Sequence, residues 1–132
     1  RVIGLCHSEK SAKRLLDLEF CDDVFCADAT QPVPVMEKIS EMTNGKMADI
    51  CINNVNIPNT EMTSVLITKD DGIVYFFSMS TSFTKAALGA EGVGKDVTMI
   101  IGNGYTKGHA EITLQELREC PRLRKVFEEL YA

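Results

Sequence analysis

Short apolar runs alternate with amphipathic segments along the whole chain. Five of these runs have the length of strands that are buried on both faces, and they cover residues 2–6, 24–27, 49–53, 73–77 and 97–101. Apolar positions at helical spacing predict helices over 9–18, 32–43, 60–68, 80–88, 113–120 and 121–130. Alternation of strands and helices is typical of a parallel sheet with helices on both faces. The predicted fold class is therefore α/β with a doubly wound parallel sheet.

Local signals mark where the predicted elements begin and end. Ser8 is placed to cap the first helix, and Thr113-Leu114-Gln115-Glu116 has the pattern of a capping box for a helix that ends near Cys120. Asp70-Asp71-Gly72 predicts a turn before the strand at 73–77, and the glycine-rich stretch 89–95 predicts a loop before the last strand. Because no linker or internal repeat interrupts this order, the 132 residues are expected to form one compact layered structure.

The composition is that of a globular protein, and it narrows the possible partners. The 132 residues are 45% hydrophobic and 25% charged, with a formal net charge of -5 at pH 7. This balance excludes disordered and fibrous classes. Since the chain has no basic cluster, neither nucleic acid nor an anionic membrane surface is an expected partner. No apolar run approaches the about 18 residues that a membrane-spanning helix requires.

The cysteines and histidines indicate a reducing compartment rather than a metal site. The five cysteines are an odd number without a C-x-x-C pair, so they are expected to be reduced thiols in a cytoplasmic protein. With His7 and His109 as the two histidines, no clustered set of metal ligands is predicted. The chain starts at Arg1, within a predicted buried strand, so we expect it to be part of a longer protein.

Polar side chains follow the predicted strands. In an open α/β sheet, ligands bind beyond the carboxyl ends of the strands, so these positions form the candidate site. They are His7-Ser8, Asp28-Ala29-Thr30, Asn53-Asn54-Val55-Asn56, Ser78-Met79-Ser80 and Gly102-Asn103-Gly104. Their small amide and hydroxyl groups suit hydrogen bonds to ribose, carboxamide and phosphate. The three asparagines within four residues are the least ordinary of these sequences.

Two glycine-rich sequences match phosphate-binding loops only in part. Residues 89–95 fit G-x-x-x-x-G-K, but Asp96 stands where a P-loop has Ser or Thr, and the predicted order of helix, loop and strand is the reverse of a P-loop. Residues 102–108 follow a strand, but the helix, second strand and acidic residue of a dinucleotide loop do not follow them. The first is expected to be a crossover loop, and the second to turn the chain near a cofactor or another domain. No nucleophile or general base is identified.

Longer stretches of the sequence indicate a protein family more specifically than these short motifs do. Residues 2–10, 26–30, 52–56, 72–92 and 101–110 resemble the L-erythro-3,5-diaminohexanoate dehydrogenase family, and the resemblance covers essentially the whole chain. It implies the carboxyl-terminal, NAD(P)-binding part of a two-domain enzyme. Residues 1–132 would then be a partial Rossmann-like domain, truncated at its N-terminus. The first strand and G-x-G-x-x-G turn of such a domain are not in this sequence, and neither is a separate catalytic domain.

The resemblance also implies a reaction of anaerobic lysine fermentation. An NAD(P)-dependent oxidoreductase would oxidise the C3 amine of L-erythro-3,5-diaminohexanoate by passing hydride from C3 to the nicotinamide. Water would then hydrolyse the imine to 5-amino-3-oxohexanoate and ammonia. The implied partners are the small diamino acid and the missing N-terminal catalytic domain, with a homo-oligomer as a further option. NAD and NADP stay open as alternatives, and the 132 residues alone are expected to be inactive.

The resemblance places several groups of residues around the cofactor. Glu9 would suit the 2′-hydroxyl of the adenosine ribose, whereas Ser8 with Lys10 would suit a 2′-phosphate. The full set is His7, Ser8, Glu9 and Lys10 at the adenosine ribose, Asp28 and Ala29 at the adenine, Asn53, Asn54 and Val55 beneath the nicotinamide ribose, Ser78 and Met79 near the nicotinamide, and Asn103 as a further cofactor-binding candidate.

Two other classes of protein fit the same strand ends. A doubly wound sheet can bind a nucleotide or metabolite without catalysis, as a sensor module. A methyltransferase would also bind an adenosine group at a strand-end acid. Binding of S-adenosylmethionine would identify the methyltransferase, whereas a full-length protein without an upstream domain would indicate the sensor.

Overall fold

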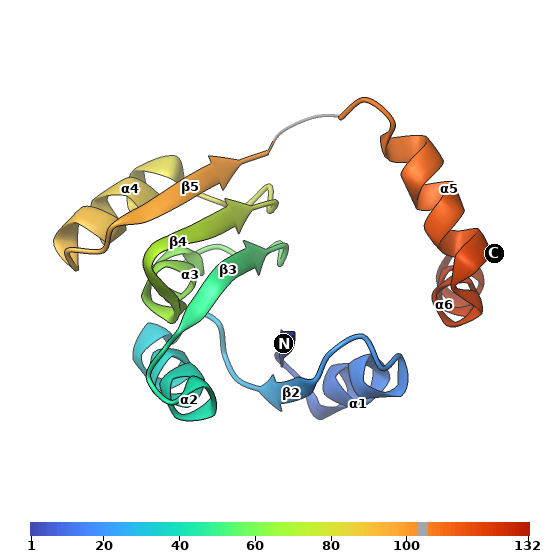
Figure 1. The fold of residues 1–132 in the computed structure, drawn as a ribbon, viewed down its shortest axis with the longest axis horizontal. Coiled ribbons are helices and arrows are strands. Elements are labelled where there is room, and N and C mark those ends of the chain that lie inside the picture. Colours follow the sequence, from blue (N-terminus) through green and yellow to red (C-terminus); the bar gives the residue numbers. More distant parts are fainter. Residues whose placement is uncertain (103–105) are drawn as a thin grey trace. The chain divides into compact units, whose positions relative to one another are not determined.

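A computed structural model describes residues 1–102 and 106–132. Its parallel strands and intervening helices confirm the predicted α/β class (Figure 1). The strands form two hydrogen-bonded sheets, and the chain divides into two compact units, residues 1–26 with 104–132, and residues 27–103. Across the described parts of the chain, no helix is both long enough and apolar enough to cross a membrane.

The first unit contains a two-stranded parallel sheet, in which β1 (Ile3–Cys6) pairs with β2 (Asp23–Cys26). Helix α1 (Glu9–Asp17) connects the two strands. Ser8 caps α1 as predicted, because its hydroxyl accepts a 3.2 Å hydrogen bond from the Ser11 amide.

Two further helices, α5 (His109–Glu119) and α6 (Pro121–Tyr131), belong to the first unit. Helix α6 starts with Pro121, which has no backbone N–H. The amides of the first helical turn have no acceptor within the helix, so a proline is well suited to this position. Arg122 on α6 forms an ion pair with Glu19, and its guanidinium lies 5.8 Å from the ring centroid of Phe20. These contacts attach α6 to the segment that follows α1.

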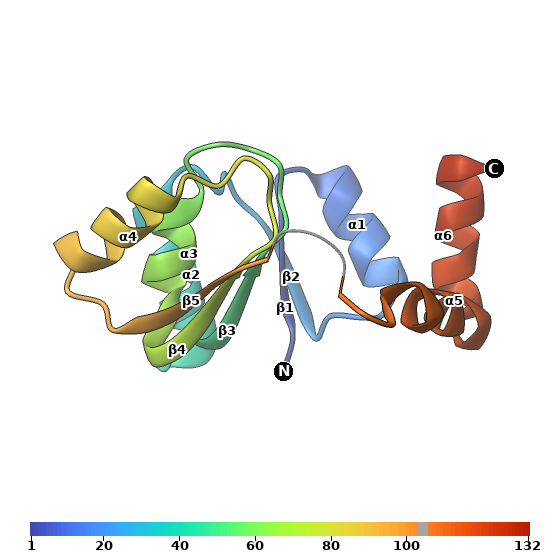
Figure 2. The same cartoon turned by 90° about the horizontal axis from the view of Figure 1, so that it is seen from above.

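The second unit is built on a three-stranded parallel sheet in the order β3-β4-β5. Its strands are β3 (Ala48–Asn53), β4 (Thr68–Phe76) and β5 (Val97–Ile101). Its helices are α2 (Pro32–Thr43), α3 (Glu61–Ile67) and α4 (Phe83–Gly92). Figure 2 shows all three helices on one face of this sheet.

The core of the second unit lies between this helical layer and the sheet. Successive side chains of a strand point to opposite faces, and the register places Cys51, Val74 and Met99 in one row that faces the helices. Val74 and Phe76 are fully buried and pack with Ala86 of α4. Buried apolar residues of the other two helices are Val35, Ile39 and Val65.

Two predicted boundaries in the second unit are wrong. Asp70-Asp71-Gly72 lies inside β4, which already begins at Thr68, but the register between β3 and β4 shifts across this segment and Asp71 has a positive φ of 60°, so the predicted turn is an irregularity within the strand. The glycine-rich stretch is not a loop throughout, because α4 continues to Gly92 and buries Gly89. In both places the local turn signal falls inside an element rather than at its boundary.

The predicted capping box in the first unit is also wrong. Helix α5 begins at His109, so Thr113 lies inside it, and the Thr113 hydroxyl donates a 2.8 Å hydrogen bond to the His109 carbonyl. The N-cap is Gly108, which has a positive φ of 85°. A capping-box pattern within a longer helix therefore does not mark its start.

Candidate functional site

The loops that follow β3 and β4, residues 54–60 and 77–82, meet at the carboxyl ends of these strands. We call them the strand-end loops. The Phe77 amide donates to the Asn53 carbonyl at 2.8 Å. The Ser80 hydroxyl donates to Asn56 Oδ1 at 2.9 Å. The fold therefore brings two of the predicted polar sequences together in one place.

Asn53 is buried beneath the first strand-end loop, with 6% of its surface exposed. Its Nδ2 donates to Thr60 Oγ1 and to Ser64 Oγ, both at 2.9 Å. Its Oδ1 accepts a 3.3 Å hydrogen bond from the Val55 amide. The structure thus uses both ends of this amide to hold the loop. A direct contact between Asn53 and a ribose stays a prediction.

Thr60, Ser64 and Thr68 form a column of buried hydroxyls along α3, each at most 4% exposed. Their hydroxyls donate to the carbonyls of Ile57, Thr60 and Ser64, respectively. Because these protons are already donated, the oxygens of Thr60 and Ser64 act as acceptors toward Asn53. Our sequence analysis missed this column, although its spacing of four residues, T-x-x-x-S-x-x-x-T, is a usable signal.

Glu61 holds the second strand-end loop and was also missed. Its side chain is buried, with 2% of the residue exposed, and Oε1 accepts a 2.7 Å hydrogen bond from the Ser82 amide. Ser82 is the N-cap of α4, where its hydroxyl accepts from the Lys85 amide. The Lys85 ammonium donates to Asn59 Oδ1 on the first loop. The start of α4 is therefore tied to α3 and to the loop before it.

The groups that remain exposed on the strand-end loops are the ones available to a ligand. Asn54 is exposed, and Val55 is 36% exposed. Ser78 is half-buried, and its hydroxyl accepts a 3.1 Å hydrogen bond from the Ser80 amide. Met79, three residues beyond the end of β4, is 96% exposed. Each loop thus presents one such group shortly after its strand ends, the Asn54 amide after β3 and the Met79 side chain after β4.

Asp28 and Ala29 lie near the start of the second unit. The hydroxyl and the amide of Thr30 both donate to Asp28 Oδ1, at 2.7 and 2.9 Å, and these bonds hold the pKa of Asp28 below its ordinary value. The Ala29 carbonyl accepts a 2.6 Å hydrogen bond from the Thr63 hydroxyl. At neutral pH this site therefore offers an ionised, exposed carboxylate on a backbone that is anchored to α3.

Four candidate residues follow β1 in the first unit, namely His7, Ser8, Glu9 and Lys10. Apart from Ser8, they are exposed. The Ser8 hydroxyl is occupied as the cap of α1, and it donates to Ser11 Oγ at 2.9 Å. Glu9 lies near Cys26 at the end of β2, where burial and then this carboxylate raise the pKa of the Cys26 thiol. Contact between these four residues after β1 and an adenosine ribose stays a prediction.

The first glycine motif does not have the arrangement of a P-loop. The Lys95 ammonium donates to the Thr68 carbonyl at 2.7 Å, so this lysine binds the end of α3 where the motif turns from α4 into β5. That order of elements is the one predicted, and it is not a P-loop. The second motif is only partly described. Asn103, a further cofactor-binding candidate, lies outside the described residues.

These features define an α/β protein with parallel strands whose polar ends are held together by buried hydrogen bonds. Two curated relatives carry the same enzyme name. The chain is 61% identical to an L-erythro-3,5-diaminohexanoate dehydrogenase of Acetoanaerobium sticklandii and 52% identical to one of Fusobacterium nucleatum, over 131 residues in each case. These alignments confirm the predicted resemblance. They cover 99% of this chain, which spans 38% of the length of each curated relative.

Comparisons with protein-family models and with solved structures do not identify the chain further. No protein-family model matches the chain. Among solved structures, a JamJ enoyl reductase in its apo form is similar with a TM-score of 0.47 and 12% identity, over 98% of this chain and 42% of that one.

Proposed function

We propose that this chain is the NAD(P)-binding part of a dehydrogenase that converts L-erythro-3,5-diaminohexanoate to 5-amino-3-oxohexanoate and ammonia. The observation that carries the proposal is the 61% identity over 131 residues to a protein named L-erythro-3,5-diaminohexanoate dehydrogenase. A second relative with the same name, 52% identical over the same length, supports it. The remainder of such an enzyme, outside these residues, would carry the substrate-binding domain.

The grouping of the strands supports a dinucleotide-binding origin. A doubly wound dinucleotide-binding sheet has the order 3-2-1-4-5-6. Removal of its first strand leaves a 3-2 pair and a 4-5-6 triplet. The two sheets here have that grouping, with β2 paired to β1 and with β3, β4 and β5 in sequence order. The strands also run parallel within each sheet, as this order requires.

The strand-end loops suit a nicotinamide nucleotide in their chemistry. NAD(P), when bound, supplies the hydride acceptor of the reaction, and the protein supplies position and electrostatics. Asn54 would donate to a ribose hydroxyl or the carboxamide, and Met79 would pack on the flat ring. Asn53 and Glu61 would act as positioning residues, because they fix the loops without exposing their own polar atoms.

The remaining candidates are proposed in the roles that the resemblance implies. His7, Ser8, Glu9 and Lys10 would bind the adenosine ribose, and Asp28 with Ala29 would border the adenine. Since the Asp28 pKa is lowered, its carboxylate would stay charged near the adenine at neutral pH.

The test uses the whole protein. Incubation with L-erythro-3,5-diaminohexanoate and either NAD or NADP should form reduced nicotinamide and ammonia in equal amounts. Asn54→Ala should raise the KM for the cofactor, whereas Glu37→Ala, on the exposed side of α2, should not. Cofactor binding without any turnover would favour the sensor module, and S-adenosylmethionine binding would favour the methyltransferase. Either result, or no reduced nicotinamide with both cofactors, overturns the proposal.

A further inference from the structure

Three of the five cysteines lie within residues 1–26, close to the two-stranded sheet of the first unit. Cys6 ends β1, Cys26 ends β2, and Cys21 lies just before β2. A Cβ atom on Gly4 would lie 2.6 Å from Leu15 Cδ2 of α1 and 3.1 Å from Cys21 Sγ, so this face of β1 points toward α1. Figure 2 shows β1 and β2 edge-on, with α1 on one side of them. Cys6 follows Gly4 by two residues and therefore lies on the face that α1 covers.

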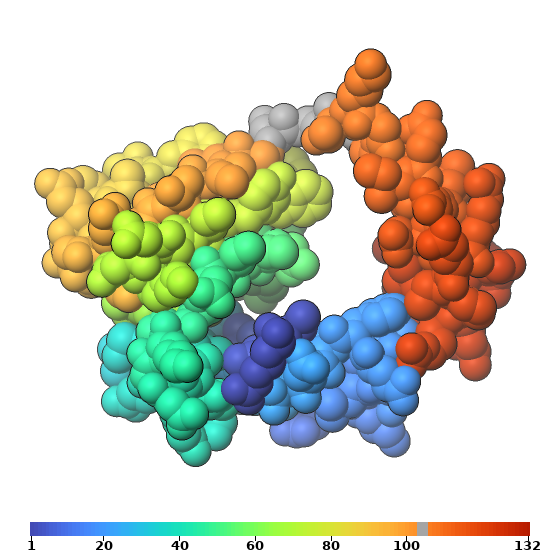
Figure 3. Space-filling view, viewed as in Figure 1, coloured from blue at the N-terminus to red at the C-terminus, as the bar shows by residue number. Residues whose placement is uncertain are grey.

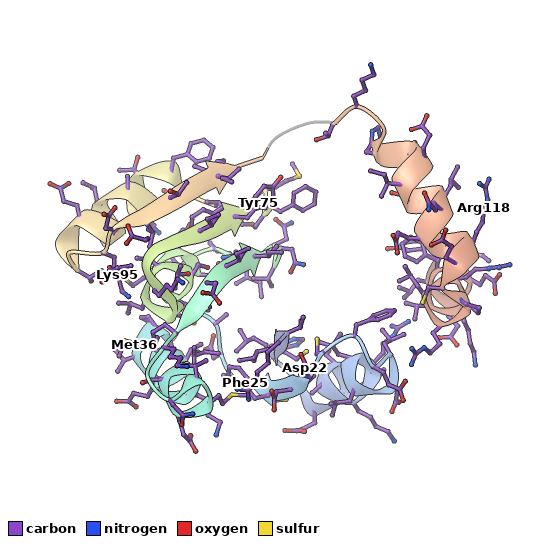
Figure 4. All side chains as sticks on the ribbon, viewed as in Figure 1. Asp22, Phe25, Met36, Tyr75, Lys95 and Arg118 are labelled. Atoms are coloured by element: carbon purple, nitrogen blue, oxygen red, sulfur yellow. The ribbon has the colours of Figure 1, made fainter. Side chains whose placement is uncertain are left out.

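Cys6 and Cys26 stand opposite each other on the two strands. The parallel register pairs Gly4 with Val24 and Cys6 with Cys26, and Val24 Cγ2 lies 3.4 Å from a Cβ atom on Gly4. Both cysteines therefore lie on the same face, and both are half-buried. Phe25, labelled in Figure 4, is the neighbour of Cys26 on β2. In Figure 3, the atoms of residues 1–26, in shades of blue, pack against one another.

The spacing of paired strands permits a disulfide between Cys6 and Cys26, but not a fully relaxed one. Neighbouring strands lie about 4.8 Å apart, which is within the about 4.4–6.8 Å that separates the Cα atoms of bridged cysteines. The Cβ atoms of a disulfide are about 3.8 Å apart, so the two strand ends must draw together slightly. A bond formed at this cost is reduced more easily than a relaxed one, which suits a reversible modification.

We propose that Cys6 and Cys26 are a redox-sensitive pair, which hydrogen peroxide converts to a disulfide and an external dithiol restores. The thiolate of one cysteine attacks a peroxide oxygen, the O–O bond breaks, and a sulfenic acid and hydroxide form. The thiolate of the other cysteine attacks the sulfenic sulfur, the S–S bond forms, and hydroxide leaves. With the two thiol protons, two thiols and one peroxide give one disulfide and two waters. Exchange with the dithiol returns both thiols and leaves the dithiol oxidised.

The surroundings of the pair favour its reduced state at rest. Burial raises the pKa of both thiols, and the carboxylate of Glu9 on α1 raises that of Cys26 further. Since the thiolate is the form that reacts, both cysteines are slow to react at neutral pH. The pair therefore responds to sustained oxidation rather than to brief exposure.

The disulfide would lie next to the candidate residues that follow β1. Cys6 is followed directly by His7, and the Ser8 cap and the first turn of α1 come next. Movement of the end of β1 toward β2 would therefore displace these residues. If they bind the adenosine ribose, oxidation weakens cofactor binding. This consequence rests on the proposed function, whereas formation of the disulfide does not.

Peptide mapping of the whole protein tests the pairing without any substitution. After hydrogen peroxide treatment, free thiols are blocked with N-ethylmaleimide, and the protein is cut on the amino side of aspartate. Cuts before Asp17, Asp22, Asp23 and Asp28 place Cys21 and Cys26 on separate peptides. We expect the Cys6 peptide joined to residues 23–27, lighter by two hydrogen atoms than the two reduced peptides together, and separated again by dithiothreitol. A link from Cys6 to residues 17–21, or oxidation of Cys6 and Cys26 without a link, overturns the proposal.

Titration with NADH and with NADPH then measures the consequence for the cofactor. Peroxide should raise the Kd of the wild-type protein by about threefold or more, and dithiothreitol should reverse the change. Cys26→Ser should abolish this response, whereas Cys120→Ser, at the junction of α5 and α6, should keep it. An equal response in Cys26→Ser shows that the pair does not act on the cofactor. If the reduced protein binds neither nucleotide, the proposed function is wrong, and the peptide map still decides whether the disulfide forms.

Discussion

Asn53→Asp changes one atom of the side chain and should destabilise the second unit severely. The amide Nδ2 donates to Thr60 and Ser64, whereas a carboxylate oxygen at the same place can only accept. The hydroxyl protons of Thr60 and Ser64 are already donated to the carbonyls of Ile57 and Thr60. In the variant, a carboxylate oxygen would therefore face the oxygens of Thr60 and Ser64 with no proton between them, in a buried site.

The size of the effect follows from the contacts. Loss of the two donated hydrogen bonds costs about 1 kcal/mol each. Asn53 is 6% exposed, so the new carboxyl must either stay ionised in a buried site or take up a proton, which adds about 1–3 kcal/mol. We expect a total loss of about 3–5 kcal/mol in the free energy of unfolding at neutral pH.

The pH dependence has a definite sign. Burial favours the neutral acid, so the folded-state pKa of the new carboxyl lies above its unfolded value. Stability from the neutral acid is present below the unfolded pKa and is lost as the pH rises through the folded pKa. The defect of Asn53→Asp should therefore shrink as the pH is lowered toward about 4, whereas that of Asn53→Ala should not change with pH.

Urea unfolding of the whole protein, followed by circular dichroism at several pH values, measures both effects. Asn54→Asp is the matched control, because Asn54 is the exposed neighbour of the same residue type. It should change stability by less than about 0.5 kcal/mol. An Asn53→Asp protein as stable as the wild type, or a defect that grows at low pH, would refute the reasoning about the buried donors.

Three further predictions concern single contacts. Gly102→Ala should destabilise by about 1 kcal/mol or less in urea unfolding, because its Cβ would lie 2.3 Å from the Tyr75 hydroxyl oxygen and the half-buried Tyr75 ring would have to shift, and Tyr75→Phe should restore part of the loss. Burial raises the pKa of the Cys51 thiol to about 11, so its alkylation by iodoacetamide should be slow near neutral pH and should accelerate toward that value. Glu61→Ala should lower the thermal midpoint because the Ser82 amide loses its acceptor, and Glu61→Gln, which keeps an oxygen there, should recover most of it. Equal midpoints for the last two variants would contradict this.

The sequence was enough to predict that the candidate site is polar. It could not show which of the polar residues are buried and hold the loops, and which are exposed and available to a ligand. Asn53, Asn54 and Val55 are adjacent in the chain and were assigned one common role. In the structure, Asn53 is buried and Asn54 is exposed, because alternate residues at the end of β3 face opposite ways. The partners of Asn53 come seven and eleven residues later, at the N-cap of α3 and within α3. No local pattern could show that they meet.

The alternation of apolar runs and amphipathic segments was enough to predict the α/β class, the parallel strands and the cap at Ser8, because these depend on side-chain periodicity and on neighbours within a few residues. Tertiary structure alone decided that β4 begins at Thr68 rather than after a turn, and that Glu61 holds the start of α4. It also decided which apolar side chains of the sheet are buried and which stay exposed. Those outcomes depend on pairing between residues far apart in the chain, where hydrogen bonds and packing with distant partners override local preference.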